Sequence, residues 1–187
     1  MTSLAGNAAL TQNHFKLFSL PVSFDLDLQQ LSANFRALQQ SVHPDRFANA
    51  SAQEKRLSVQ RAAQINEAHQ ILKSPQRRAR YILELQGVVF DDQSNPVMDP
   101  MFLMQQMELR EALSNVKSKP DPGSELDKIL ASLKTAKKDI LQQLAGQLNK
   151  PEMADLDKAS QLMHELQFLD KLQSESEVIE EELMDSL

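Results

Sequence analysis

His43, Pro44 and Asp45 are the residues of this chain whose types and spacing most suggest chemistry. An imidazole and a carboxylate can act as an acid–base pair, and both can also recognise a partner through hydrogen bonds. Here they flank a proline, which stops a preceding helix and restricts His43 to extended backbone conformations. Since neither a nucleophile nor a glycine-rich phosphate loop accompanies them, recognition is favoured over catalysis. We therefore expect a protein that is not an enzyme.

The other residues that commonly bind metals form no pattern of their own. His14, His69 and His164 lack metal-ligand spacing, and the absence of Cys excludes disulfides and thiolate metal sites. No apolar run approaches the roughly 20 residues that cross a bilayer. The first dozen residues resemble neither a signal peptide nor a transit peptide. We expect a cytoplasmic protein with no metal and no other cofactor.

Charge is distributed unevenly along the chain. Residues 1–86 carry 10 Lys and Arg against 6 Asp and Glu, a net +4, whereas residues 87–187 carry 10 against 20, a net −10; the two sum to the −6 of the whole chain. This asymmetry indicates two modules with different partners, although two ordinary solvated surfaces would give the same figures.

The His-Pro-Asp tripeptide lies where two predicted helices would be joined as a hairpin. Asp27, with Gln30 as a capping-box partner, begins the first helix, and Ser51 with Glu54 begins the second. The apolar stripes predicted to pair them are Leu28, Leu31, Phe35, Leu38 and Val42 on one helix and Leu57, Ala62, Ile65, Ala68 and Leu72 on the other. Two further helices complete this module, over 15–20 and from Ser74-Pro75 to Gly87.

A turn-rich stretch, residues 87–98, separates this module from a second helical one. Its predicted helices run from Pro100 to about Val116, over roughly 125–148, and from Lys150-Pro151 onward. The last helix has a core stripe of Leu162, Leu166 and Leu169, and its acidic end over 175–185 either extends it or frays. We predict an all-α protein with one domain over 1–86, a linker over 87–98 and a three-helix bundle over 99–187.

The predicted helix after Pro100 has apolar residues on two faces. At about 100° per residue, a core stripe is formed by Phe102, Leu109, Leu113 and Val116. The nearly opposite face holds Leu103, Met104 and Met107, flanked by Glu108 and Glu111, with Arg110 on the side of Leu103. Because a helix in a small bundle needs one buried face, the second is a candidate partner site, rich in the adaptable side chain of Met. Packing against another part of the chain is the alternative.

Three segments resemble HscB-type co-chaperones of iron–sulfur cluster assembly: FKLFSLP at 15–21, VHPDRF at 42–47 and QRAAQINEAHQILKSPQRRARYIL at 60–83. The resemblance implies an N-terminal J-domain that binds an HscA-type (DnaK-like) chaperone and raises its ATPase rate. The residues it implicates are His43, Pro44, Asp45, Arg46 and Arg36. Many J-domains present a row of Lys and Arg before the motif, but this chain offers only Arg36 there. Its other cations, Lys55, Arg56 and Arg61, lie on the next helix.

Two segments of the second module also resemble this family, FLMQQMELREAL at 102–113 and FLDKL at 168–172. They match the segments with which HscB proteins contact the cluster scaffold IscU. The resemblance implies scaffold binding by Leu103, Met104, Met107, Glu108, Arg110, Glu111 and Phe168. It further implies a co-chaperone that delivers IscU to HscA. Some eukaryotic relatives carry an N-terminal Cys-pair metal site, so a chain without Cys is expected to be of the bacterial type.

Three other functions compete with this interpretation. A general J-domain protein would serve DnaK with a different client. A helical nucleic-acid-binding protein would use the basic first module, but +4 is modest and the acidic second module would repel phosphate. A long structural coiled coil is disfavoured because prolines interrupt the heptads, at Pro100, Pro120, Pro122 and Pro151.

Overall fold

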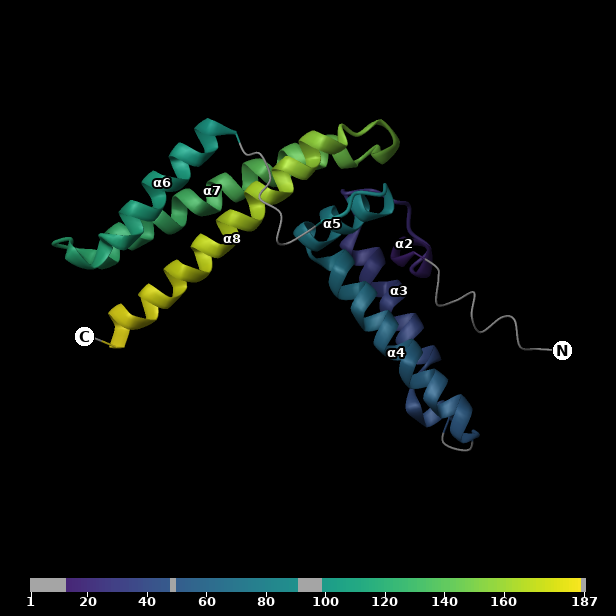
Figure 1. Cartoon of the computed structure of the whole chain (residues 1–187). Coiled ribbons are helices and arrows are strands. Elements are labelled where there is room, and N and C mark those ends of the chain that lie inside the picture. Colours follow the sequence, from purple (N-terminus) through teal and green to yellow (C-terminus); the bar gives the residue numbers. More distant parts are fainter. Residues whose placement is uncertain (1–12, 48–49, 91–98, 186–187) are drawn as a thin grey trace. The chain divides into compact units, whose positions relative to one another are not determined.

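The computed structural model describes residues 13–47, 50–90 and 99–185, and within these residues all regular structure is helical (Figure 1). The predicted all-α fold is confirmed. Contacts between residues divide the chain into two compact units, Met1–Ile82 and Leu83–Leu187. The domain boundaries at residues 86 and 98 stay a prediction, and residues 91–98 of the predicted linker lie outside the described residues.

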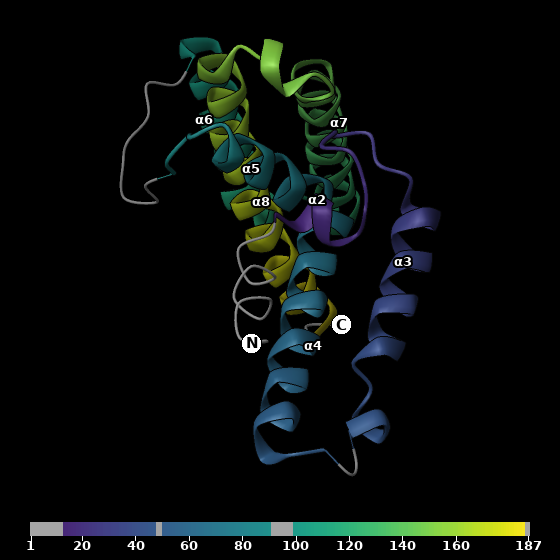
Figure 2. The same cartoon turned by 90° about the vertical axis from the view of Figure 1, so that its right-hand side faces the viewer.

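The N-terminal unit is built on a hairpin of two antiparallel helices, α3 (Leu28–Ser41) and α4 (Ala52–Lys73), which lie side by side. A 3-10 turn, η1 (Pro44–Phe47), follows α3 at the tip of the hairpin (Figure 2). The unit also contains the short helix α2 (His14–Leu17) and most of α5 (Pro75–Leu85). Helix α5 begins directly after α4 and ends three residues beyond Ile82, the last residue of the unit.

Side-chain caps fix where the hairpin helices begin. The Asp27 carboxylate accepts hydrogen bonds from the backbone amides of Gln29 and Gln30, at 2.9 and 3.0 Å. Ser51 and Glu54 form a reciprocal capping box, in which the Ser51 amide donates to Glu54 and the Glu54 amide donates to Ser51 Oγ. Each cap satisfies amides that a helix leaves without internal partners, so these start points were readable from local sequence.

Fewer residues of the two predicted stripes are buried than expected. Leu31 and Val42 are buried from the first stripe, and Ile65, Ala68 and Leu72 from the second. The predictions for Leu28 and Leu57 are wrong, since these side chains are 48% and 49% exposed. The buried line of α4 runs through Ser58, Ile65 and Leu72, and Leu57 is displaced from it by about 100°.

The C-terminal unit is a three-helix bundle of α6 (Pro100–Ser114), α7 (Pro122–Leu148) and α8 (Leu156–Asp185). α7 and α8 pack along each other, and α6 contacts both. Their shared core is formed by Leu113, Val116, Leu126, Leu133, Leu144, Leu148, Leu162, Leu166, Leu169 and Leu172. The predicted core stripe of the last helix is therefore confirmed at all three of its positions.

The last helix begins later than predicted. Pro151 opens only a 3-10 turn, η3 (Pro151–Met153), and the chain is then extended at Ala154, with φ −69° and ψ 140°. Asp155 provides the cap that starts α8, because its carboxylate accepts from the Lys158 amide at 3.0 Å. The acidic end does not fray within the described residues, since α8 continues to Asp185.

Candidate functional site

His43 and Asp45 lie together at the exposed tip of the hairpin. The Asp45 amide is 3.3 Å from His43 Nδ1, and the Asp45 carboxylate is 3.4 Å from the same nitrogen. A neutral ring accepts from the amide there, whereas a protonated ring donates to the carboxylate. Their side chains are 59% and 89% exposed, so this internal pair is weak and both groups are available to a partner.

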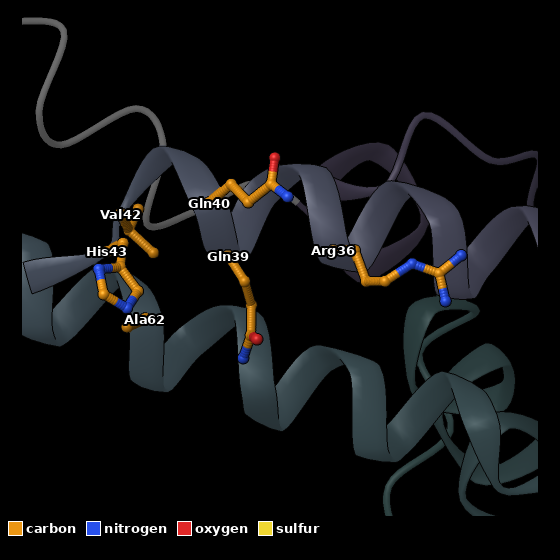
Figure 3. A pocket seen from close by; sticks show the side chains of 6 residues that line it. All are labelled: Arg36, Gln39, Gln40, Val42, His43 and Ala62. Carbon is orange, nitrogen blue, oxygen red and sulfur yellow. The ribbon is translucent and has the colours of Figure 1, made fainter. Parts of the chain in front are cut away.

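His43 and Arg36 line one pocket on the side of the hairpin (Figure 3). The pocket has a volume of about 440 Å³ and its walls are Arg36, Gln39, Gln40, Val42, His43 and Ala62. Gln39 Nε2 donates to Asn66 Oδ1 at 2.7 Å and thereby ties α3 to α4 next to the pocket. The hairpin thus brings two of the predicted chaperone-binding residues, seven positions apart, to the same place.

Arg46 and Asp45 do not line this pocket but are exposed beside it. Arg46 Nη1 makes a long hydrogen bond, 3.5 Å, to the carbonyl oxygen of Gln40 near the end of α3. Gln39, Gln40, Val42 and Ala62 were not among the predicted site residues. Gln39, Gln40 and Val42, at the end of α3 and its cap, lie within one helical turn of His43, a spacing from which they could have been predicted.

Aromatic stacking and a buried arginine hold the hairpin in shape. The rings of Phe35 and His69 stack with centroids 3.9 Å apart, linking α3 to α4. Burial, and secondarily Lys73, lowers the pKa of His69 and so favours the neutral ring. Arg78 is 5% exposed and donates through Nη1 to the carbonyl oxygen of Leu72 at 2.7 Å, which fixes α5 against the end of α4.

The second predicted site lies on the surface of α6. Leu103, Met104 and Met107, called here the α6 apolar face, are 45%, 60% and 73% exposed. On the core side of α6, Leu113 is buried together with Gln106, a polar residue that the sequence analysis did not place in the core. Gln106 has the spacing of the core stripe, four residues after Phe102 and seven before Leu113, so helical period alone would have found it.

Charged residues border the α6 apolar face on two sides. On one side Arg110 lies over the ring of Phe168, 5.1 Å from its centroid, and pairs with Glu175 at 3.5 Å. This contact, with an edge-on packing of Phe102 at 6.3 Å, places Phe168 of α8 next to α6. On the other side the exposed Glu108 and Glu111 line a pocket of about 500 Å³ between α6 and α7.

The described part of the chain offers no arrangement for metal binding. No cluster of three or more His, Asp or Glu residues there is placed to hold an ion. Among the same residues, no helix has the length and apolar character needed to span a membrane. The geometry provides two exposed surfaces, one on each compact unit, and each contains residues that the sequence predicts to bind a partner.

Each of the two units matches a model of a known protein family. The model of the DnaJ domain matches residues 14–81, and the model of the HSCB C-terminal oligomerisation domain matches residues 98–177. The first match contains the hairpin and its tip, and the second contains all three helices of the bundle apart from the end of α8.

Relatives match the chain over nearly its whole length. The co-chaperone protein HscB homolog of Shewanella loihica is 46% identical over 171 residues, covering 91% of this chain and 99% of the relative. The structure of chaperone HscB from Vibrio cholerae has a TM-score of 0.78 at 44% identity and covers 92% of this chain and 99% of that one. The crystal structure of human co-chaperone protein HscB has a TM-score of 0.81 at 24% identity, covers 91% and 83%, and supports the fold alone.

These matches confirm the resemblance that the sequence motifs indicated. A J-domain is a partner module of Hsp70-type chaperones and not a catalytic domain. The chain belongs to the HscB family of J-domain co-chaperones, which are not enzymes.

Proposed function

We propose that this protein raises the ATPase rate of an HscA-type chaperone and delivers an IscU-type scaffold to it, in support of cytoplasmic iron–sulfur protein maturation. The observation that supports the proposal is that the predicted contact residues are exposed on two compact units, one set on each. Each unit matches the corresponding family model.

The hairpin tip is the proposed contact with the chaperone. Asp45, which is 89% exposed on its side chain, presents a carboxylate that pairs with a cation of the chaperone. Pro44 fixes how the chain leaves α3, so that His43 and Asp45 are presented with little backbone freedom. Arg36 and Arg46 supply positive charge on either side of His43 and help to orient the encounter.

The α6 apolar face is the proposed contact with the scaffold. Its three side chains provide most of the binding energy, because burying exposed Leu and Met surface is the principal favourable term in such interfaces. Glu108, Arg110 and Glu111 border this face and set the register of the partner. Phe168 contributes a partly exposed ring beside Arg110, and the guanidinium of Arg110 lies over this ring.

Joining the two surfaces in one chain makes delivery efficient. A scaffold held on the C-terminal unit encounters the chaperone bound to the N-terminal unit at a high effective concentration, on the order of millimolar for short linkers. The co-chaperone therefore acts by bringing its two partners together.

The test of this function is single-turnover ATP hydrolysis by an HscA-type chaperone, measured with and without an IscU-type scaffold. The intact protein should raise the hydrolysis rate, and the scaffold should raise it further. Asp45→Asn should remove at least about 90% of the stimulation, since a neutral amide cannot form the charged pair. Asp127→Asn, an exposed substitution on α7, is the matched control and should leave the rate unchanged.

Two results would contradict the proposal in different ways. Equal stimulation by the intact protein and by Asp45→Asn would remove the hairpin tip from the chaperone contact. Stimulation that the scaffold does not change, or that is larger with a general DnaK, would favour the alternative of a general J-domain protein with another client.

A further inference from the structure

An exposed apolar residue interrupts the charged surface of α4. Val59 is 65% exposed, although it lies in the middle of a helix whose opposite side is packed. It lines a shallow hollow of about 350 Å³ together with Lys55, Arg56 and Gln60. The aliphatic stems of Lys and Arg can cover apolar surface while their charges remain in water, so this hollow combines apolar walls with a cationic rim.

This hollow adjoins the pocket that contains His43. Ala62 lines that pocket and lies three residues after Val59, on a neighbouring line of the same helix about 60° away. Asn66, seven residues after Val59 and therefore almost directly in line with it, is bonded to Gln39 next to the same pocket. One surface therefore runs from His43 across Ala62 to Val59 and Lys55.

Charge on this surface is concentrated on α4. α3 contributes a single cation, Arg36, among the neutral side chains Gln29, Gln30, Gln39 and Gln40. α4 contributes two adjacent cations, Lys55 and Arg56, at the rim of the hollow. Arg61, the remaining cation of the first three turns of α4, lies about 140° from Arg56 and does not line either pocket.

We propose that α4, through Val59, Lys55 and Arg56, forms a second contact with the chaperone, and that this contact supplies the cations that α3 lacks. The occupant is an acidic surface of the HscA-type chaperone with an apolar side chain that covers Val59. Continuity with the hairpin tip favours this partner, and the cationic rim fits an acidic surface on it. The inference rests on the proposed function, because it extends the chaperone contact of the hairpin tip.

The experiment measures the concentration of full-length protein that gives half-maximal ATPase stimulation of the chaperone, without scaffold. K55E/R56E tests the rim, and V59A tests the apolar contact. Each has a matched control on the same helix that faces elsewhere: R61E for the charge and L57A for the side chain, since Leu57 is 49% exposed and about 160° from Val59. Glutamates near a helix N-terminus favour the helix, so K55E/R56E retains the fold, which circular dichroism verifies.

The proposal predicts a selective loss of affinity. The half-maximal concentration should rise about tenfold for K55E/R56E and about fivefold for V59A, and it should stay within about twofold for R61E and L57A. The effect of K55E/R56E should shrink at high salt, because screening weakens the charge pairs already present. R61E changes the net charge by −2 and K55E/R56E by −4, so a loss of affinity for R61E about half as large on a logarithmic scale would show a response to net charge only and would overturn the contact.

The same assay separates this inference from the proposed function. If Asp45→Asn abolishes stimulation while K55E/R56E and V59A behave like the unmodified protein, the hairpin tip is the chaperone site and α4 is not part of it. If the unmodified protein does not stimulate the chaperone, the proposed function fails first and the α4 contact fails with it.

Discussion

Exposed polar residues of this protein lie on its proposed contact surfaces, whereas buried polar residues affect the stability of its units. Arg78 belongs to the second group: its guanidinium donates to the Leu72 carbonyl oxygen and lies 5.1 Å from the ring centroid of Phe24. Burial lowers the pKa of Arg78, with Asp25 acting in the opposite direction. Because the carbonyl and the ring offset the cost of removing this charge from water, Arg78 can join α4, α5 and the segment before α3.

Glu165 is the buried carboxyl whose ionisation opposes folding. It is 8% exposed on α8, and burial raises its pKa, with Asp99 adding to the effect and Lys158 and Gln161 opposing it. The folded protein therefore binds a proton here at pH values where the unfolded chain has lost it. Stability contributed by this group is present below the usual pKa of 4.5 and is lost as pH rises through the raised value.

Replacing Glu165 with Gln should consequently stabilise the protein at neutral pH. The amide is neutral, and its oxygen can still accept the hydrogen bond that Gln161 Nε2 donates at 3.1 Å. Thermal unfolding followed by circular dichroism should give a higher Tm for E165Q at pH 7 and equal Tm values near pH 4. The exposed substitution E152Q is the control and should show no such pH-dependent gain. A lower Tm for E165Q at pH 7 would mean that Lys158 and Gln161 outweigh burial.

At the scale of helices, start signals were predictable and the choice of buried face was less so. The caps at Asp27 and Ser51 act on backbone amides of their own helices, so local sequence was sufficient. Two residues near the start of α8 could begin a helix, Pro151 and Asp155. Pro151 is buried and begins only a 3-10 turn, whereas Asp155 caps the first turn of α8. The exposure of Leu57 depends on which line of α4 meets α3, which is a tertiary property that periodicity alone does not fix.

Helix α6 also shows that contacts between helices are harder to predict from sequence than the faces of a single helix. Its two apolar faces were distinguished from sequence by angle, and the structure exposes the one formed by Leu103, Met104 and Met107. The neighbourhood of Phe168 was not derivable from its own helix, because it depends on the contacts of α8 with Phe102 and Arg110. Family resemblance named that residue, and packing across two helices explains why it belongs beside α6.

Truncating the α6 apolar face should weaken scaffold binding without affecting the chaperone contact. In M104A/M107A two side chains that are 60% and 73% exposed lose the surface that a partner would bury. We expect the Kd for an IscU-type scaffold, measured by calorimetry, to rise at least about tenfold. Basal ATPase stimulation should be unchanged, since the hairpin is in the other unit.

The matched control for this helix is M153A/M184A. These two methionines are 77% and 65% exposed but lie outside α6, so their truncation removes similar apolar surface from elsewhere on the C-terminal unit. Equal loss of scaffold affinity in both double variants would contradict a localised site. Loss of ATPase stimulation in M104A/M107A would contradict the division of roles between the two units.

For the whole molecule, the division into two units matches the uneven distribution of charge along the chain. The N-terminal unit, rich in Lys and Arg, carries the hairpin tip and the cationic rim of α4, whereas the acidic second half carries the α6 apolar face. If the co-chaperone works by linking two partners, each surface is useful only while it is joined to the other. Delivery then requires both binding surfaces on one chain, and two separate binding proteins would not replace it.

Mixing two complementary variants tests that linkage directly. D45N keeps the scaffold surface and lacks the chaperone contact, whereas M104A/M107A keeps the chaperone contact and lacks the scaffold surface. At about 1 μM of each, an equimolar mixture should give basal stimulation by the second variant but not the extra stimulation that scaffold produces with the unmodified protein. The reason is that the scaffold would then reach the chaperone at its bulk concentration, far below the effective concentration that a short linker provides. Full recovery of scaffold-enhanced hydrolysis by the mixture would show that the two units act independently, and the bridging role would have to be abandoned even if both sites were correctly assigned.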